Sequence, residues 1–107
     1  MNVVILIPAR YASSRYPGKP LAEITVPSGA RASLIRMSWD AGLSVGGVSA
    51  VHVATDDERI ADHCRAFGAS VIMTDETCRN GTERCADALK RTTINADIIV
   101  NLQGDAP

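Results

Sequence analysis

The sequence predicts an α/β fold with a doubly wound, mostly parallel sheet. Four apolar, strand-like runs, at residues 3–7, 50–55, 69–73 and 97–102, alternate with segments in which apolar residues recur at helical spacing. This alternation is typical of parallel strands connected by crossover helices. The first run, V-V-I-L-I, has no polar residue in it, which is typical of a strand buried on both faces of a sheet.

The first strand is followed by a loop and a short extended segment. Pro8 ends the strand, and residues 9–20 contain the serine, glycine and proline residues of a loop. We expect residues 21–26 to be extended, up to a turn at residues 27–29.

The first helix is expected over residues 33–45. Apolar residues at helical spacing predict its buried stripe, which consists of Leu34, Met37, Ala41 and Val45. Arg36 and Asp40 are four residues apart and are expected to pair on the exposed side. Gly46 and Gly47 are expected to end the helix.

The second and third helices carry start signals. Residues 55–58, T-D-D-E, have the form of a capping box, so we expect a helix to begin there. Its predicted buried stripe consists of Ile60, Ala61, Cys64 and Phe67. Gly68 is the expected stop. Asn80 begins the signal for the third helix, in which Ala86 and Leu89 are expected to face inward.

The composition limits the classes of function. The 107 residues, 46% of them hydrophobic and 21% charged, suit one globular domain. A net charge of -1 argues against general attraction to nucleic acid or to an anionic membrane. The three cysteines lack C-x-x-C spacing, so neither a zinc site nor a disulfide framework is expected, and reduced thiols suit a cytoplasmic protein. The N-terminal apolar run is too short for a signal peptide or a membrane span.

The strongest candidate site is the basic loop, residues 8–20, at the carboxyl end of the first strand. It contains Arg10, Arg15 and Lys19 and no acidic residue. Its small residues leave backbone N–H groups accessible, and arginine can bind phosphate oxygens through two hydrogen bonds. The loop therefore predicts a polyphosphate site, with an ordinary basic surface loop as the alternative. It has neither the G-x-x-x-x-G-K-[ST] nor the G-x-G-x-x-G pattern, so it is not a Walker loop and gives NAD binding little support.

A second candidate is Asp105, in the sequence Q-G-D directly after the fourth strand. Mg²⁺ prefers one or two carboxylates, with substrate phosphates and waters as its other ligands. Since the basic loop follows another strand end, a metal–phosphate site is predicted there. The alternative is an ordinary Gly-Asp turn.

Two further groups of polar residues lie at helix starts. Asn80, Gly81 and Thr82 could contact a ribose or a base, or could serve helix capping alone. Asp56 and Asp57 end the second strand and could bind a metal ion, but capping accounts for them and is the preferred interpretation.

These blocks together resemble a known family. Residues 7–21, I-P-A-R-Y-A-S-S-R-Y-P-G-K-P-L, closely resemble the N-terminal signature of the 3-deoxy-manno-octulosonate (Kdo) cytidylyltransferases. Residues 53–57, residues 73–74 with 81–84, and residues 100–105 agree with the same family in order and spacing. The related acylneuraminate cytidylyltransferases usually carry a Ser-Lys-Arg stretch in the basic loop, which is absent here.

The resemblance implies a Rossmann-like sheet of the nucleotide-diphospho-sugar transferase type. Residues 1–107 would be its N-terminal, CTP-binding part, and the sugar pocket, a second metal-binding Asp and the contacts of a homodimer would lie in the rest of a longer protein. The implied reaction uses CTP and Mg²⁺: the anomeric hydroxyl of Kdo attacks the α-phosphorus and pyrophosphate leaves. The implied setting is the cytoplasm, in the synthesis of lipopolysaccharide or surface polysaccharide, without nucleic-acid or membrane partners.

The resemblance also implies roles for single residues. The triphosphate would be held by Arg10, Arg15 and Lys19, which count as catalytic together with the Mg²⁺ ligand Asp105. Pro8 and Ala9 would present their backbone to the cytosine. The other nucleotide-binding residues would be Met73, Asn80, Gly81, Thr82 and Gln103.

Three segments depart from the family pattern. Ala106 replaces the usual Glu of Gly-Asp-Glu-Pro, residues 78–80 replace His-x-Ser, and residues 29–35 replace Gly-x-Pro-Met-Ile. Two alternatives therefore stay open: a cytidylyltransferase for another acidic sugar, and a non-catalytic, truncated paralogue that binds a nucleotide.

Overall fold

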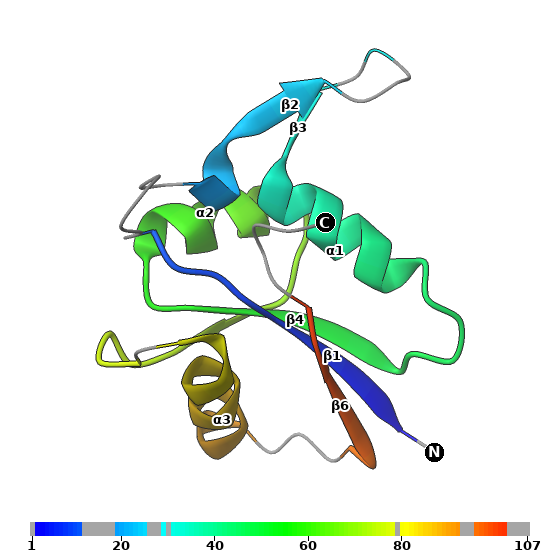
Figure 1. The fold of residues 1–107 in the computed structure, drawn as a ribbon, viewed down its shortest axis with the longest axis vertical. Helices are drawn as coiled ribbons and strands as arrows, with labels where there is room; N and C mark the ends of the chain where they lie inside the picture. Colours follow the sequence, from blue (N-terminus) through cyan, green and yellow to red (C-terminus); the bar gives the residue numbers. More distant parts are fainter. Residues whose placement is uncertain are drawn as a thin grey trace.

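A four-stranded parallel sheet forms the centre of the molecule in its computed structural model (Figure 1). The structure describes residues 2–11, 19–25, 29, 31–78, 80–92 and 96–102. The strands lie in the order β5-β4-β1-β6, with bounds Val3–Pro8 for β1, Ala50–Thr55 for β4, Val71–Met73 for β5 and Ile98–Asn101 for β6. All three strand pairings are parallel, which confirms the predicted fold class.

Helices cover both faces of this sheet. One side carries α1 (Leu34–Leu43) and α2 (Glu58–Ala66), and the other carries α3 (Gly81–Arg91) (Figure 1). Before α1 come a 3-10 turn, η1 (Lys19–Leu21), and an antiparallel hairpin of β2 (Glu23–Thr25) and β3 (Arg31–Ser33). The sequence predicts only an extended segment in place of this hairpin.

The core consists of two apolar layers, one on each face of the sheet. In β1, Ile5 and Ile7 belong to the layer under α1 and α2, whereas Val4 and Leu6 belong to the layer under α3. All four residues are at most 3% exposed. Because successive side chains of a strand point to opposite faces, this burial confirms that β1 is covered on both sides.

The predicted buried stripe of α1 is wrong by about one residue. The buried residues are Ile35, Ser38, Trp39 and Gly42, whereas the predicted stripe residue Ala41 is exposed and Val45 is 51% exposed. At Gly42 an added Cβ would lie 3.3 Å from Val51 Cγ1, so this face of the helix comes close to β4. A small and a polar residue thus lie on the buried side, where a count of apolar residues does not find them. The helix also ends at Leu43, before the predicted glycine pair.

The start of α2 also differs from the prediction. Its N-cap is Asp57, not Thr55: the Asp57 Oδ1 atom accepts the N–H groups of Arg59 at 2.8 Å and Ile60 at 3.3 Å. Thr55 Oγ1 instead accepts the N–H of Asp57 at 3.2 Å. The predicted stripe is confirmed at Ile60, Ala61 and Cys64, which are fully buried. After the helix, Gly68 adopts a φ of 86°, the left-handed conformation typical of a glycine stop.

In α3 the predicted cap is confirmed and part of the predicted inner face is wrong. Asn80 is the N-cap, and its side chain accepts the N–H of Glu83 at 2.8 Å. Ala86 is exposed; the buried residues are Arg84, Cys85 and Ala88. Leu89 packs against the core from a half-buried position.

The last strand is apolar but exposed. In β6, Ile98 is 43%, Ile99 37% and Val100 40% exposed. The strand lies at the edge of the sheet and pairs with β1 (Figure 1). An apolar edge strand of this kind is a potential surface for association. Among the described residues, no helix is long and apolar enough to cross a membrane.

Candidate functional site

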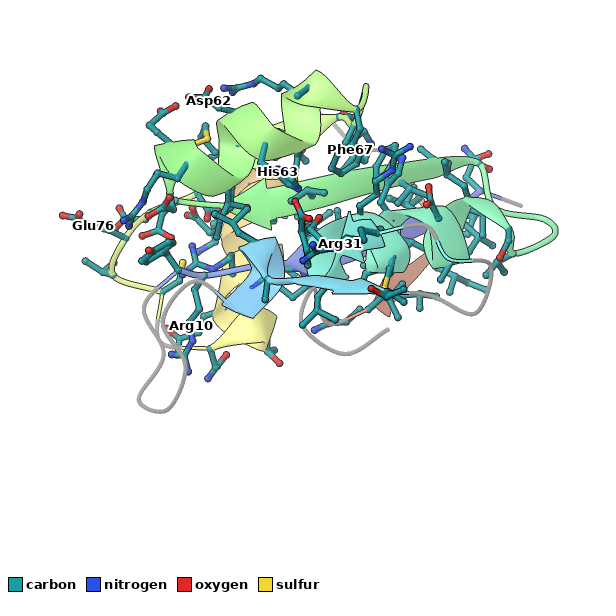
Figure 2. All side chains as sticks on the ribbon, turned by 90° about the horizontal axis from the view of Figure 1, so that it is seen from above. Arg10, Arg31, Asp62, His63, Phe67 and Glu76 are labelled. Atoms are coloured by element: carbon teal, nitrogen blue, oxygen red, sulfur yellow. The ribbon has the colours of Figure 1, made fainter. Side chains whose placement is uncertain are left out.

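A pocket of about 230 Å³ lies where the carboxyl ends of β1, β4 and β5 approach the start of α3. Its lining consists of Arg10, Tyr11, Asp56, Asp57, Arg59, Glu76, Cys78 and Arg84. Arg10 and Glu76 lie toward the same end of the molecule, away from Phe67 (Figure 2). The carboxyl edge of a parallel sheet is the usual place for a ligand in folds of this type.

The beginning of the basic loop is held at this edge by the sheet itself. Pro8 is the last residue of β1 and is in register with Ala54 of β4. The pairing continues one residue further, because the Ala9 N–H donates to the Ala54 carbonyl at 2.9 Å. Ala9 is 4% exposed, whereas Arg10 is exposed at the pocket. The backbone therefore fixes the point from which the Arg10 cation reaches out.

Tyr11 and Arg59 join the basic loop to α2. The Arg59 guanidinium carbon lies 3.3 Å from the centroid of the Tyr11 ring, in a cation–π contact. The same guanidinium binds Asp57 twice, with Nη2 at 2.7 Å from Oδ2 and Nε at 3.1 Å from Oδ1. Asp57 is thus both a helix cap and an ion-pair partner. Tyr11 lies in the predicted basic loop but has no role assigned from the sequence, and Arg59 is not predicted as part of a site.

Arg84 is the most deeply buried charged group of the pocket. Its Nη1 atom lies 3.0 Å from Asp56 Oδ1 and donates to Thr74 Oγ1 at 2.7 Å. The Arg84 side chain is 4% exposed and the Asp56 side chain 24%. Sequence analysis places Arg84 within a helix start but does not predict this pair. The one signal in the sequence is that Asp56 and Arg84 each belong to a block that agrees with the family pattern.

The predicted nucleoside residues lie at two neighbouring places. Met73 is the last residue of β5, in register with Thr55, and is half-buried. Gly81 begins α3 and Thr82 is exposed in its first turn. The Asn80 side chain is engaged as the cap, which confirms the capping interpretation. Since β5 and β1 both pair with β4, their ends are about two strand spacings, or ~10 Å, apart.

Several predicted site residues lie outside the part of the chain that the structure describes. These are Arg15, Gln103 and Asp105, and for Lys19 only its place in η1 is described. Their roles stay predictions. Among the described residues, no group of three or more His, Cys, Asp or Glu side chains is arranged to hold a metal ion.

Two of the thiols belong to the core. Cys64 and Cys85 are buried, and burial raises the pKa of each thiol to about 11. At neutral pH both are protonated and poorly nucleophilic, as expected of cysteines that serve packing.

Asp57 should make the stability of the protein depend on pH. Hydrogen bonds from the Arg59 side chain and from the N–H groups of Ile60 and Arg59 lower the pKa of Asp57 below its ordinary value of 3.8. The contribution of this carboxylate is therefore present above pH 3.8 and is lost as the pH falls through the lower folded-state pKa. We expect Asp57→Ala to lower the free energy of unfolding by ~1 kcal/mol at pH 7, as for the loss of a helix cap.

Urea denaturation at pH 7, pH 3 and pH 2 measures this difference. Asp57→Asn is the matched control, since it keeps a capping oxygen and loses the charge, and it should cost less than the alanine change. A difference between wild type and Asp57→Ala that stays constant down to pH 2 would contradict the assignment.

Comparison with known proteins gives one consistent result. The sequence model of the family described as cytidylyltransferase matches residues 4–107. A 3-deoxy-manno-octulosonate cytidylyltransferase of Maricaulis maris is 52% identical over the whole chain, and a mitochondrial one of Arabidopsis thaliana is 51% identical over 99% of it. An 8-amino-3,8-dideoxy-manno-octulosonate cytidylyltransferase of Shewanella woodyi is 46% identical. The chain spans 39%, 35% and 42% of the lengths of these three relatives.

The fold is also similar to a solved structure. A CMP:2-keto-3-deoxy-manno-octonic acid synthetase complexed with CTP superimposes with a TM-score of 0.87 at 42% identity. The match covers 97% of this chain and 40% of the other. The predicted Rossmann-like fold and the predicted family resemblance are confirmed.

Proposed function

We propose that this chain, which belongs to the cytidylyltransferase family, provides the CTP-binding part of an enzyme that transfers CMP to Kdo and releases pyrophosphate. One observation carries the proposal. The segment Pro8-Ala9-Arg10 is fixed at the carboxyl end of β1, beside a pocket, in a fold that superimposes on a synthetase complexed with CTP.

The charges of the pocket support a polyphosphate ligand. Among the described residues Arg10 makes no ion pair, whereas the acids Asp56 and Asp57 are each engaged by an arginine of the pocket. The cation at the end of β1 is therefore available, and two of the three acids that line the pocket are paired with arginines. Arg15 and Lys19, later in the same loop, would add two further positive charges.

The reaction needs alignment and charge neutralisation more than a protein nucleophile. The anomeric hydroxyl of the sugar attacks the α-phosphorus, and the bond to pyrophosphate breaks. Arg10, Arg15 and Lys19 would hold the phosphates in line and stabilise the charge that builds up on the leaving group. Pro8 and Ala9 would present their backbone to the cytosine. The other nucleotide contacts would come from Met73, Asn80, Gly81, Thr82 and Gln103.

A single carboxylate together with a triphosphate is the kind of donor set that Mg²⁺ prefers. Asp105, which follows β6 in the sequence, would hold the ion. When bound, Mg²⁺ would neutralise phosphate charge and help to orient the triphosphate.

Titration calorimetry with CTP and a pyrophosphate-release assay with Kdo test the proposal. We expect CTP to bind in preference to GTP, and we expect the full-length protein to release pyrophosphate when CTP and Kdo are both present. The 46% identity with the Shewanella woodyi relative makes 8-amino-3,8-dideoxy-manno-octulosonate a specific second candidate for the sugar. In the full-length protein, a panel of these two sugars and N-acetylneuraminate decides between them, whereas CTP binding without turnover on any sugar would favour the non-catalytic paralogue.

The biological setting follows from the proposed product. A CMP-activated Kdo would supply lipopolysaccharide or surface-polysaccharide synthesis, and we propose a cytoplasmic homodimer as the working form. Sedimentation analysis of the purified protein tests the dimer, and cell fractionation tests the location.

A further inference from the structure

A buried arginine borders the proposed CTP site from the α3 side. Charged side chains are rarely this buried unless they are paired, and the Arg84 guanidinium has two partners, Asp56 and Thr74. Asp56 directly follows β4, and Thr74 directly follows β5. One guanidinium thus joins the ends of two strands to the helix whose first turn carries the predicted nucleoside contacts.

The same helix turn is tied to Arg84 through the backbone. The Arg84 N–H donates to the Asn80 carbonyl at 3.1 Å, and the Asn80 side chain caps the helix. The contacts of the Arg84 side chain and the cap by Asn80 therefore both act on the first turn of α3.

The ion pair between Arg84 and Asp56 also affects the net charge of the pocket. Three acids line it, Asp56, Asp57 and Glu76, and a triphosphate would be repelled by each free carboxylate. Asp57 is bound by Arg59 and Asp56 by Arg84. Since the Asp56 side chain is still 24% exposed, its negative charge would act on a ligand in the pocket if Arg84 were absent.

We propose that Arg84 is a positioning residue of the nucleotide site, which cancels the charge of Asp56 beside the triphosphate and holds the first turn of α3 in place. This inference rests on the proposed binding of CTP. It goes beyond that proposal because it assigns the Arg84–Asp56 pair a role in the affinity for the triphosphate of CTP. No contact of Arg84 with the nucleotide is required.

Four variants test it: Arg84→Met, Asp56→Asn, the double variant, and Arg36→Met as control. The affinities for CTP and for cytidine are measured by calorimetry, and folding is checked by circular dichroism. We expect Arg84→Met to weaken CTP binding about tenfold and cytidine binding much less, because repulsion by one carboxylate acts only on the phosphates. The CTP loss should shrink at high salt.

The double variant distinguishes repulsion by the Asp56 charge from a structural effect of losing Arg84. It removes both charges, so CTP affinity should return to within about threefold of wild type, and Asp56→Asn alone should bind CTP at least as tightly as wild type. Arg36, which pairs with Asp40 at 3.9 Å on the exposed side of α1, lines no part of this pocket, so Arg36→Met should leave both affinities unchanged.

The outcomes separate the two proposals. Equal weakening of CTP and cytidine in Arg84→Met, without recovery in the double variant, would show a purely structural role and overturn this inference alone. If Arg84→Met does not fold, Asp56→Asn decides the matter, since weaker CTP binding in that variant contradicts the assigned charge effect. A wild-type protein that binds cytidine but no CTP would overturn the proposed function and this inference with it.

Discussion

Replacing Lys19 or Asp105 with alanine in the full-length enzyme is expected to abolish CMP-sugar formation from CTP. Lys19 begins η1, and the turn is anchored because Pro20 is buried and Leu21 packs against the core. Its ammonium group would supply a compact positive charge to the triphosphate. Asp105 would hold Mg²⁺. We expect each change to lower kcat/KM by at least ~10²–10³-fold, which corresponds to about 3–4 kcal/mol of transition-state stabilisation.

The two variants should differ in which step they impair, CTP binding or turnover. Lys19→Ala should weaken CTP binding as well as turnover, whereas Asp105→Ala should affect turnover and the dependence on Mg²⁺ concentration more than binding. Lys90→Ala and Asp62→Ala remove the same charges from exposed positions on α3 and α2 and should leave the rate unchanged. Pyrophosphate release measures the rate, and unchanged turnover in Lys19→Ala or Asp105→Ala would remove the role assigned to that residue.

The order and type of the main elements could be predicted because the strands are dense in apolar, β-branched residues and the segments between them have helical spacing. The buried face of α1 could not be predicted in this way. That face includes Ser38 and Gly42, which a count of apolar residues passes over. Close approach of the helix to β4 selects a residue without a side chain at Gly42, a property of tertiary packing that has no periodic signature in the sequence.

The candidate site was predictable where its residues are adjacent in the chain. The start of the basic loop and the cap of α3 are local features, and the structure has both at the edge of the sheet. The contacts of Arg59 with Tyr11 and of Arg84 with Asp56 join distant segments, so no spacing rule indicates them. These pairs form only because the sheet topology brings the ends of particular strands together, and the order of strands in a sheet cannot be read from local sequence.

Leu6→Ala is expected to cause the largest loss of stability by a single change in the core. Leu6 is fully buried in β1, which is paired on both edges, and it packs in the layer under α3 with Ala54 and Cys85. Truncation removes apolar contacts and leaves a cavity that the strand pairings on either side prevent from closing. We expect the free energy of unfolding to fall by ~2–5 kcal/mol.

Leu43→Ala is the matched control, because the same atoms are removed from a side chain that is 58% exposed at the end of α1. It should change stability by no more than ~0.5 kcal/mol. Urea denaturation measures both, and equal losses at the two positions would contradict the assignment of Leu6 to the core. Since a domain of this size is stable by only about 5–15 kcal/mol, the Leu6 variant should also populate unfolded chains at physiological temperature. Because α3 rests on the same layer, we expect CTP affinity to decrease even in the folded fraction, whereas Leu43→Ala should bind CTP as wild type does.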